Sequence, residues 1–124
     1  MQYFEIPIRP APKQRPRMTK NGRVYTPKPT KVAEHFIRNF IRRCNPTKID
    51  GAISVKAEFI FQRPKTNKNA HHQVRPDLDN LVKLLLDGLQ DKYGVFEDDK
   101  SIVELHSVKK YGERNMIKLW VKEV

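Results

Sequence analysis

The sequence of 124 residues has little of several features that would assign a protein to a class at once. Its one cysteine, Cys44, has no partner for a disulfide within the chain. No apolar run approaches the roughly 20 residues that a membrane-spanning helix needs. The first residues show neither a basic start with a long apolar stretch nor a small-residue cleavage site. We therefore expect no membrane segment, no secretion signal and a reducing, cytoplasmic setting.

Acidic residues are scarce in the first part of the chain. Residues 1–49 hold 12 Lys and Arg against 2 Asp and Glu, whereas residues 50–124 hold 13 against 12. Nearly all of the net charge of +11 is therefore N-terminal. Such an excess is typical of proteins that bind a polyanion, because neutralising phosphates releases counterions. The charge indicates a nucleic-acid partner but does not separate DNA from RNA.

The spacing of apolar residues predicts a small domain in which strands and helices alternate. A period of two predicts strands, and a period of 3.6 residues predicts helices. The expected strands cover residues 3–8, 52–61, 101–109 and 116–121, the last two forming a C-terminal hairpin, and the expected helices cover residues 30–44 and 77–89. The order β-α-β-α-β-β indicates one α/β or α+β domain over residues 1–124, with a small mixed, partly antiparallel sheet.

Two rows of apolar residues run along the first predicted helix. Val32, Phe36, Phe40 and Cys44 form one row, and Ala33, Ile37 and Ile41 form the neighbouring row. Together they predict a broad buried stripe, in which Cys44 is a small core residue rather than a nucleophile.

Two further segments show no period. Residues 9–29 hold five prolines among basic residues, which predicts a long basic loop. Residues 62–75 are polar and basic, and we expect a mobile loop with His71 and His72 in solvent.

Acidic residues crowd into one part of this basic chain. The stretch from Asp77 to Asp99 holds 7 acids against Lys83 and Lys92. Two carboxylates about 5 Å apart at an effective dielectric near 20 repel by ~3 kcal/mol, so several that converge need a bound cation. Mg²⁺ prefers oxygen ligands and commonly takes one or two carboxylates together with substrate phosphate oxygens. The cluster predicts a divalent-metal site.

Simpler roles account for parts of the acidic pattern. An Asp at a helix start caps backbone N–H groups, which explains Asp77 or Asp79 but hardly both together with the downstream pair. Taken alone, Lys83 is explained by a surface pair with Asp79 of about 0.2 to 0.5 kcal/mol. A calcium loop of the EF-hand type would place Val82 where Gly is needed and Gly88 where Glu is needed. The four histidines and the single cysteine lack zinc-ligand spacing.

The run Arg75-Pro-Asp77-Leu-Asp79-Asn80-Leu-Val-Lys83, followed by Asp87 and by Asp98-Asp99 ahead of a strand, resembles the RusA-type Holliday-junction resolvases of bacteria and their prophages. The segments Pro12-Lys-Gln-Arg-Pro-Arg17 and Tyr25-Thr-Pro27 are also similar to Gram-positive and phage members of that family. The resemblance spans nearly the whole chain.

The resemblance implies a homodimeric endodeoxyribonuclease, dependent on Mg²⁺ or Mn²⁺, that makes paired symmetric nicks in a four-way DNA junction during recombination and repair. The site residues that it implies are the metal carboxylates Asp77, Asp79 and one of Asp98 and Asp99, the essential lysine Lys83, and the supporting residues Asn80 and Asp87. Of the downstream pair, we favour Asp99 as the ligand.

Basic side chains of the two irregular segments are candidate contacts to the phosphates of a junction, and a solvated basic loop is the alternative role. They are Lys13, Arg15, Arg17, Lys20, Arg23 and Lys28 in the first segment, and Arg63, Lys65, Lys68 and Arg75 in the second. Met116 and Trp120, on the outer face of the last strand, are candidates for a dimer interface.

Two other functions remain open from the residues alone. A non-catalytic nucleic-acid-binding protein would use the same basic loops but leaves the acidic cluster without a role. A metal-dependent nuclease of other specificity would use the same chemistry on another substrate.

Overall fold

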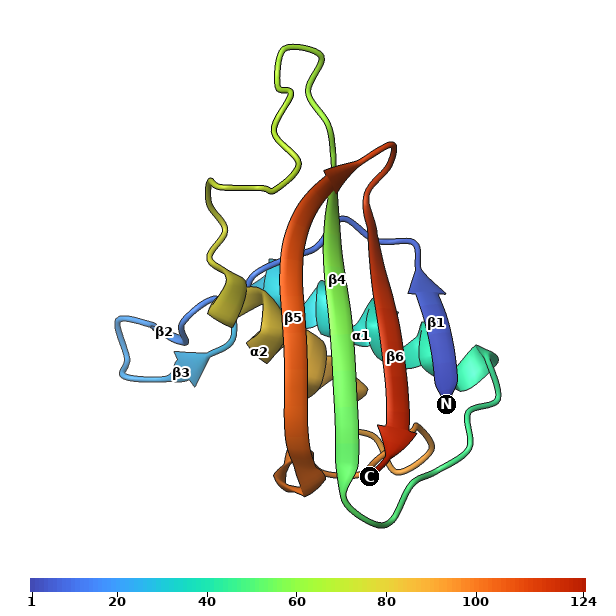
Figure 1. Ribbon diagram of the computed structural model, residues 1–124. Helices are drawn as coiled ribbons and strands as arrows, with labels where there is room; N and C mark the ends of the chain where they lie inside the picture. The colour runs from blue at the N-terminus through green and yellow to red at the C-terminus, as the bar shows by residue number, and fades with distance from the viewer.

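The computed structural model describes all of residues 1–124 and places two helices on one face of a four-stranded sheet (Figure 1). The strands of this sheet are β1 (Gln2–Ile6), β4 (Ile53–Gln62), β5 (Ile102–Gly112) and β6 (Met116–Glu123). The helices are α1 (Lys28–Arg43) and α2 (Leu78–Leu89), and a short 3-10 helix, η1 (Asp99–Ser101), precedes β5. No helix has the length and apolar character needed to cross a bilayer. The predicted α+β class and the order of these main elements are confirmed.

The predicted C-terminal hairpin is wrong. β5 and β6 follow one another in the chain, but β4 lies between them, parallel to β5 and antiparallel to β6, and β6 also pairs antiparallel with β1. The inward residues Ile117, Leu119 and Val121 of β6 are almost fully buried, as suits an inner strand of the sheet. Val103 and Leu105, in the first half of β5, are exposed, which is consistent with the position of β5 at the edge of the sheet.

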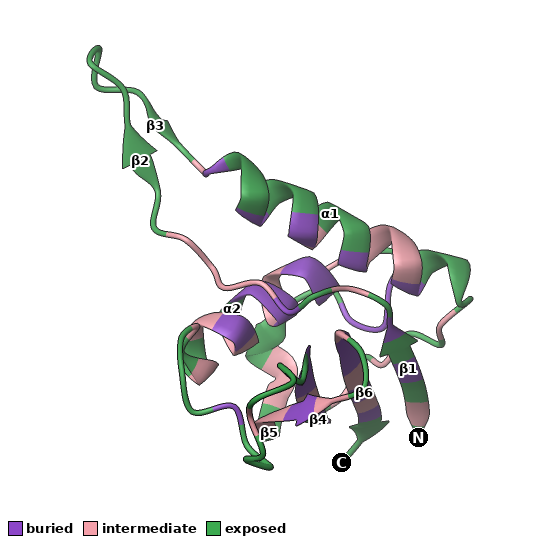
Figure 2. Ribbon diagram, turned by 90° about the horizontal axis from the view of Figure 1, so that it is seen from above, coloured by how far each residue is buried: buried purple, intermediate pink, exposed green.

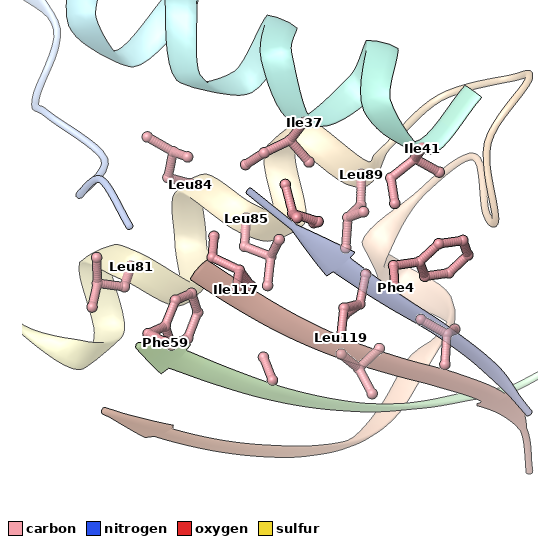
Figure 3. Close-up of a cluster of buried hydrophobic side chains, with 14 of the residues drawn as sticks. Phe4, Ile37, Ile41, Phe59, Leu81, Leu84, Leu85, Leu89, Ile117 and Leu119 are labelled. Carbon is pink, nitrogen blue, oxygen red and sulfur yellow. The ribbon is translucent and has the colours of Figure 1, made fainter. Parts of the chain in front are cut away.

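The core fills the space between the helices and the sheet (Figure 3). Alternate residues of β4 point to the helices, as its sequence predicts, and the apolar face of α2 covers them. Ile37 and Ile41 of α1 pack above Leu85 and Leu89 of α2. Each such side chain contributes about 1.5 to 3 kcal/mol by its burial. The core therefore fixes α2, which carries most of the predicted site, on the sheet.

Only one of the two predicted apolar rows of α1 is buried. Ala33, Ile37 and Ile41 face α2, whereas Val32 is 58% and Phe36 41% exposed. Cys44 is exposed as well, so its predicted place in the core is wrong. The reason is geometric: α1 packs mainly on α2, which covers one row of side chains, and of the neighbouring row only Phe40 packs against the core.

The segment over residues 9–29 is not only a loop, because it contains an antiparallel ribbon of β2 (Arg17–Met18) and β3 (Val24–Tyr25). Its turn is closed by hydrogen bonds from Gly22 N to Thr19 O, 3.0 Å, and from Thr19 N to Arg23 O, 2.8 Å. Gly22 has φ +81°, a left-handed conformation that glycine adopts without strain. The ribbon is exposed throughout and projects away from the sheet and helices (Figure 2). The pair Asn21-Gly22 is the sequence signal for this hairpin.

Candidate active site

The start of α2 presents two carboxylates to solvent. Asp77 occupies the N-cap position with extended backbone angles, yet its side chain makes no capping hydrogen bond. Asp79 lies in the first turn, and its Oδ1 accepts a hydrogen bond from the backbone N–H of Asn80 at 2.9 Å. Both residues are exposed, and neither forms an ion pair. Capping therefore does not account for Asp77, and its oxygens are free to bind another group.

Lys83 lies one helical turn beyond Asp79, on the same face of α2. Its side chain is exposed and is not engaged in an ion pair, so the surface pair with Asp79 is not formed. Asp87 follows one turn later and is paired with Lys13. The ammonium group of Lys83 and the carboxylates of Asp77 and Asp79, none of them in an ion pair, thus share one end of the helix.

A hollow of about 480 Å³ lies beside Asp77. Its lining combines three prolines with polar and charged side chains, among them Arg9, Lys13, Arg75 and Asn80. Two arginines beside a carboxylate are suited to hold a phosphate next to a carboxylate-bound cation. Arg9 was not predicted as a site residue, because in the sequence it is one of many basic residues in a proline-rich run. Arg75 was predicted as a DNA contact and lines the hollow.

Lys109 on β5 fixes the chain that leads into α2. Its Nζ donates to the carbonyl oxygens of Val74 and Pro76, at 2.8 Å each, directly before Asp77. Nothing in the sequence singles out Lys109, because its partners are backbone atoms more than 30 positions away. It is a positioning residue that the sequence analysis missed.

His72 gives the same segment a second anchor, and its predicted place in solvent is wrong. The imidazole is buried and stacks on Phe61 with ring centroids 4.0 Å apart, and the ring of Tyr111 lies 5.1 Å away. Burial, and then the charge of Lys109, lowers the pKa of His72. A histidine in a polar loop carries no sequence signal of burial when the covering rings come from two distant strands. The segment over residues 62–75 is irregular but is attached to β4 and β5.

Lys13 joins three parts of the molecule. Its Nζ lies 2.5 Å from Glu34 Oε1 on α1 and 3.1 Å from Asp87 Oδ2 on α2, and its backbone N–H donates to Asn80 O at 2.9 Å. Although burial opposes the charged form, the hydrogen bonds with Glu34 and Asp87 raise the pKa of Lys13. These bonds favour a role in positioning α2 over a free contact to a phosphate. Asp87 takes part in the same ion pair.

Asp98 and Asp99 lie at the start of β5, away from Asp77. Lys109 reaches the chain beside Asp77, and Ile102 lies roughly 23 Å before Lys109 along β5, at about 3.3 Å per residue. Figure 1 shows η1 at the foot of β5 and the start of α2 beside its upper half. No three His, Cys, Asp or Glu side chains gather at a spacing that could hold a metal ion. Within a single chain, Asp99 therefore does not lie close to Asp77 and Asp79.

The two residues of the downstream pair differ in their surroundings. The backbone N–H of Lys100 donates to Asp98 Oδ1 at 3.0 Å, and this lowers the pKa of Asp98. Burial, followed by the hydrogen bond and charge of Asp98 and the charge of Asp87, raises the pKa of Asp99. Asp98 is thus engaged in a local turn, and the Asp99 carboxylate interacts with that of Asp98.

The predicted DNA contacts fall into groups with different surroundings. Arg15, Arg17, Lys20, Arg23 and Lys28 are exposed on or beside the ribbon, and Lys65 and Lys68 are exposed on the segment after β4. Arg63 donates to Asn69 O at 2.5 Å and lies over the ring of Tyr111, so it braces its own segment. The exposed residues are the ones free to meet a phosphate.

Comparison with known proteins adds a family to this geometry. Residues 7–122 match the family described as Endodeoxyribonuclease RusA. The chain is also 26% identical over 137 aligned residues to the Uncharacterized protein YqaN of Bacillus subtilis (strain 168), with 98% of this chain and 95% of that protein covered.

Proposed function

The chain belongs to the RusA endodeoxyribonuclease family, and on that premise we propose that it resolves four-way DNA junctions in recombination and repair, using a divalent metal. One observation carries the proposal. The start of α2 combines carboxylates at Asp77 and Asp79 that form no ion pair, a free ammonium group at Lys83 and a hollow flanked by Arg9 and Arg75. A protein that only bound nucleic acid would gain nothing from two exposed acids at this point.

The donor set fits a hard divalent cation. Asp77 and Asp79 supply carboxylate oxygens, which Mg²⁺ and Mn²⁺ prefer, and no lysine or arginine neutralises either of them. When bound, such an ion neutralises charge on the phosphate and lowers the pKa of a bound water. Asp77 and Asp79 would hold it, and one of them would also orient the water.

The basic residues around the carboxylates have separate tasks in this scheme. Arg9 and Arg75 hold the DNA phosphate in the hollow beside Asp77. Lys83 contacts the scissile phosphate or the leaving 3′-oxygen, where negative charge develops during cleavage. Asn80 and Asp87 support the site indirectly, Asn80 through the backbone bond to Lys13 and Asp87 through the ion pair.

We place Asp99 in the site as a ligand from a second copy of the chain. Within one chain it lies at the far end of β5 from the segment that Lys109 holds. A four-way junction has approximate two-fold symmetry, and so does the commonest homodimer. A dimer that brings Asp99 of one copy to Asp77 and Asp79 of the other accounts for both the separation and the paired cuts.

The first test uses a labelled four-way junction and a matched linear duplex, with Mg²⁺ or with chelator. We expect symmetric nicks in the junction alone, and none with chelator or with Asp79→Asn. Lys83→Ala should lower the cleavage rate about 100-fold or more while binding changes little, because a group acting on developing charge contributes on that scale. Lys92→Ala, at another exposed lysine, is the matched control and should cleave normally.

The outcomes separate the alternatives. Binding without nicking by the wild type would assign the chain to non-catalytic nucleic-acid binders. Equal cutting of flaps, RNA or linear duplex would assign it to nucleases of another specificity. Equal losses of binding and cleavage in Lys83→Ala would make that residue a simple DNA contact.

The second test addresses the shared site. Asp79→Asn and Asp99→Asn should each be inactive alone. Mixed and exchanged, the two variants form a heterodimer in which one site has all of its native carboxylates, so single nicks should return. No recovery under conditions that exchange subunits would exclude a site shared between two copies, and full activity of Asp99→Asn alone would place Asp99 outside the site.

A further inference from the structure

The ribbon of β2 and β3 lies at the centre of an acid-free stretch of the chain. Between Glu5 and Glu34 there are 8 Lys and Arg and no Asp or Glu. Residues 17–25 make hydrogen bonds only among themselves, and the ribbon projects from the body in Figure 2. A strongly positive, isolated ribbon is complementary to a polyanion rather than to the rest of this chain.

The two faces of the ribbon differ in chemistry. Met18 lies opposite Val24 in the strand pairing, so their side chains share one face, and they are 68% and 63% exposed. Arg17 lies opposite Tyr25, and these side chains share the other face. Lys20 stands in the turn at the tip. The ribbon therefore exposes an apolar pair within a basic surround.

The root of the ribbon is close to the proposed cleavage site. The backbone of Lys13 is hydrogen-bonded to Asn80, next to Asp79. Five residues of extended chain reach at most about 17 Å, so Met18 lies within that distance of Lys13. At about 3.4 Å per nucleotide, this is a span of roughly five nucleotides of DNA.

This arrangement has a specific use on branched DNA. Apolar side chains that a DNA-binding protein inserts between base steps unstack the bases and kink the duplex. At the branch point of a junction the stacking is already interrupted, so insertion costs least there. Phosphates on either side would meet the basic residues of the ribbon.

We propose that Met18 and Val24 form an apolar wedge that inserts among the bases at the branch point of a DNA junction, while Arg17, Lys20 and Arg23 hold the flanking phosphates. The inference rests on the proposed junction-resolving function and explains how a branched substrate is chosen over linear duplex. A perfect duplex offers the basic residues the same phosphates but offers the wedge no opened step.

The test measures base unstacking directly. 2-Aminopurine is placed at the branch point of an immobile junction and at the same sequence in a linear duplex. Its fluorescence and the affinity of each DNA are measured with chains carrying Asp79→Asn to block cleavage. We expect binding to raise the fluorescence of the junction but not of the duplex.

The double substitution Met18→Ser and Val24→Ser should lower that rise about fivefold and reduce the preference for junction about tenfold, which is 1.4 kcal/mol. Duplex affinity should stay within about twofold, because the basic residues are intact. Met18→Leu with Val24→Ile should retain the signal. Lys20→Ala is the matched control, and it should weaken junction and duplex alike.

Three results would overturn the wedge. These are an unchanged fluorescence rise in the Ser variant, an equal loss on both DNAs, or a loss of dimer mass, which would make the ribbon an arm between subunits. Wild-type nicking of the same junction, measured in parallel, keeps the two proposals apart. Nicking without a fluorescence rise refutes the wedge alone, whereas no nicking of any junction refutes the proposed function.

Discussion

Lys109 carries a positioning role through two hydrogen bonds to backbone carbonyls. Its bonds to Val74 O and Pro76 O hold the chain immediately before Asp77 against β5. Lys109→Met keeps most of the length of the side chain but removes both bonds. Because misplacing a reacting group by about 1 Å can cost on the order of 100-fold in rate, we expect the cleavage rate to fall at least about tenfold.

Junction affinity of Lys109→Met should change by less than about threefold, since one lost charge is a small part of the phosphate contacts. Lys110→Met is the matched control: Lys110 is adjacent, points to the other face of the sheet and pairs with Glu58 at 2.9 Å. Equal rates for the two variants would remove Lys109 from the positioning of Asp77.

His72 makes the attachment of its segment sensitive to pH. Its pKa is lowered by burial and then by Lys109, so the folded form binds a proton less readily than the unfolded chain. The stabilisation is therefore complete above the unfolded pKa of about 6.5 and is lost as the pH falls through the lower folded pKa.

The measurement is thermal unfolding of the wild type and of His72→Phe between pH 7.5 and pH 4.5. The wild type should lose stability relative to the variant as the pH falls, because only its ring must accept a buried charge. His71→Phe, at the exposed neighbour, should follow the wild type. Parallel curves for wild type and His72→Phe would show that His72 binds its proton equally well in the folded and the unfolded chain.

At the scale of elements, the missing side chain of Gly88 on α2 lets α1 pack closely against α2. A Cβ at this position would lie 3.3 Å from Glu34 O and 3.3 Å from the Cβ of Ile37, tighter than ordinary contact. Gly88→Val should therefore push the helices apart and lower the free energy of unfolding by about 1 to 3 kcal/mol. Urea unfolding should show a lower midpoint with the same slope.

The control for this substitution is Lys31→Val, an exposed position on α1, which should change stability by under about 0.5 kcal/mol. A stability of Gly88→Val equal to the wild type would mean that α1 shifts freely on α2. Such a shift would also alter the site, because Lys13 forms ion pairs with both helices.

Elements with a clear local period could be predicted from the sequence, and elements defined by distant partners could not. β4 and α2 have their predicted faces because a single side of each is apolar and buried. The order of strands failed because adjacency in the chain was taken for adjacency in the sheet. The ribbon over residues 17–25 escaped notice because each strand is only two residues long, although its Asn-Gly turn was visible.

The same distinction applies to the site. Asp77, Asp79 and Lys83 lie within one helical turn or two, so their spacing is local and readable. Lys109 and His72 act through contacts with distant strands, and Arg9 enters the hollow through the path of the chain after β1. The distance between Asp99 and Asp77 depends on the tilt of α2 along the sheet, which no local pattern encodes.

On the scale of the whole molecule, an extended arm with basic residues and no acids is joined to a body that holds all 14 Asp and Glu residues together with further Lys and Arg. The ribbon holds Arg17, Lys20 and Arg23, and no acid lies near it in the chain. Replacing all three by Ala should reduce the slope of log K against log salt concentration by about 2.7, at about 0.9 per phosphate contact in duplex DNA. Filter binding over a range of NaCl measures it.

Changing Lys92, Lys110 and Lys122 to Ala removes the same charge from the body and is the matched control. Its slope should stay near that of the wild type. Equal slopes for both triple variants would show that binding follows net charge and not the arm.

The position of β6 has a consequence for how the molecule forms. The first strand, β1, and the long central strand β4 both take a neighbour from β6, at the other end of the chain. During synthesis β1 and β4 have unpaired edges and exposed apolar faces until β6 leaves the ribosome. Pairing over such long separations is slow to nucleate. The nascent chain, with β4 exposed, is therefore at its greatest risk of aggregation shortly before β6 emerges.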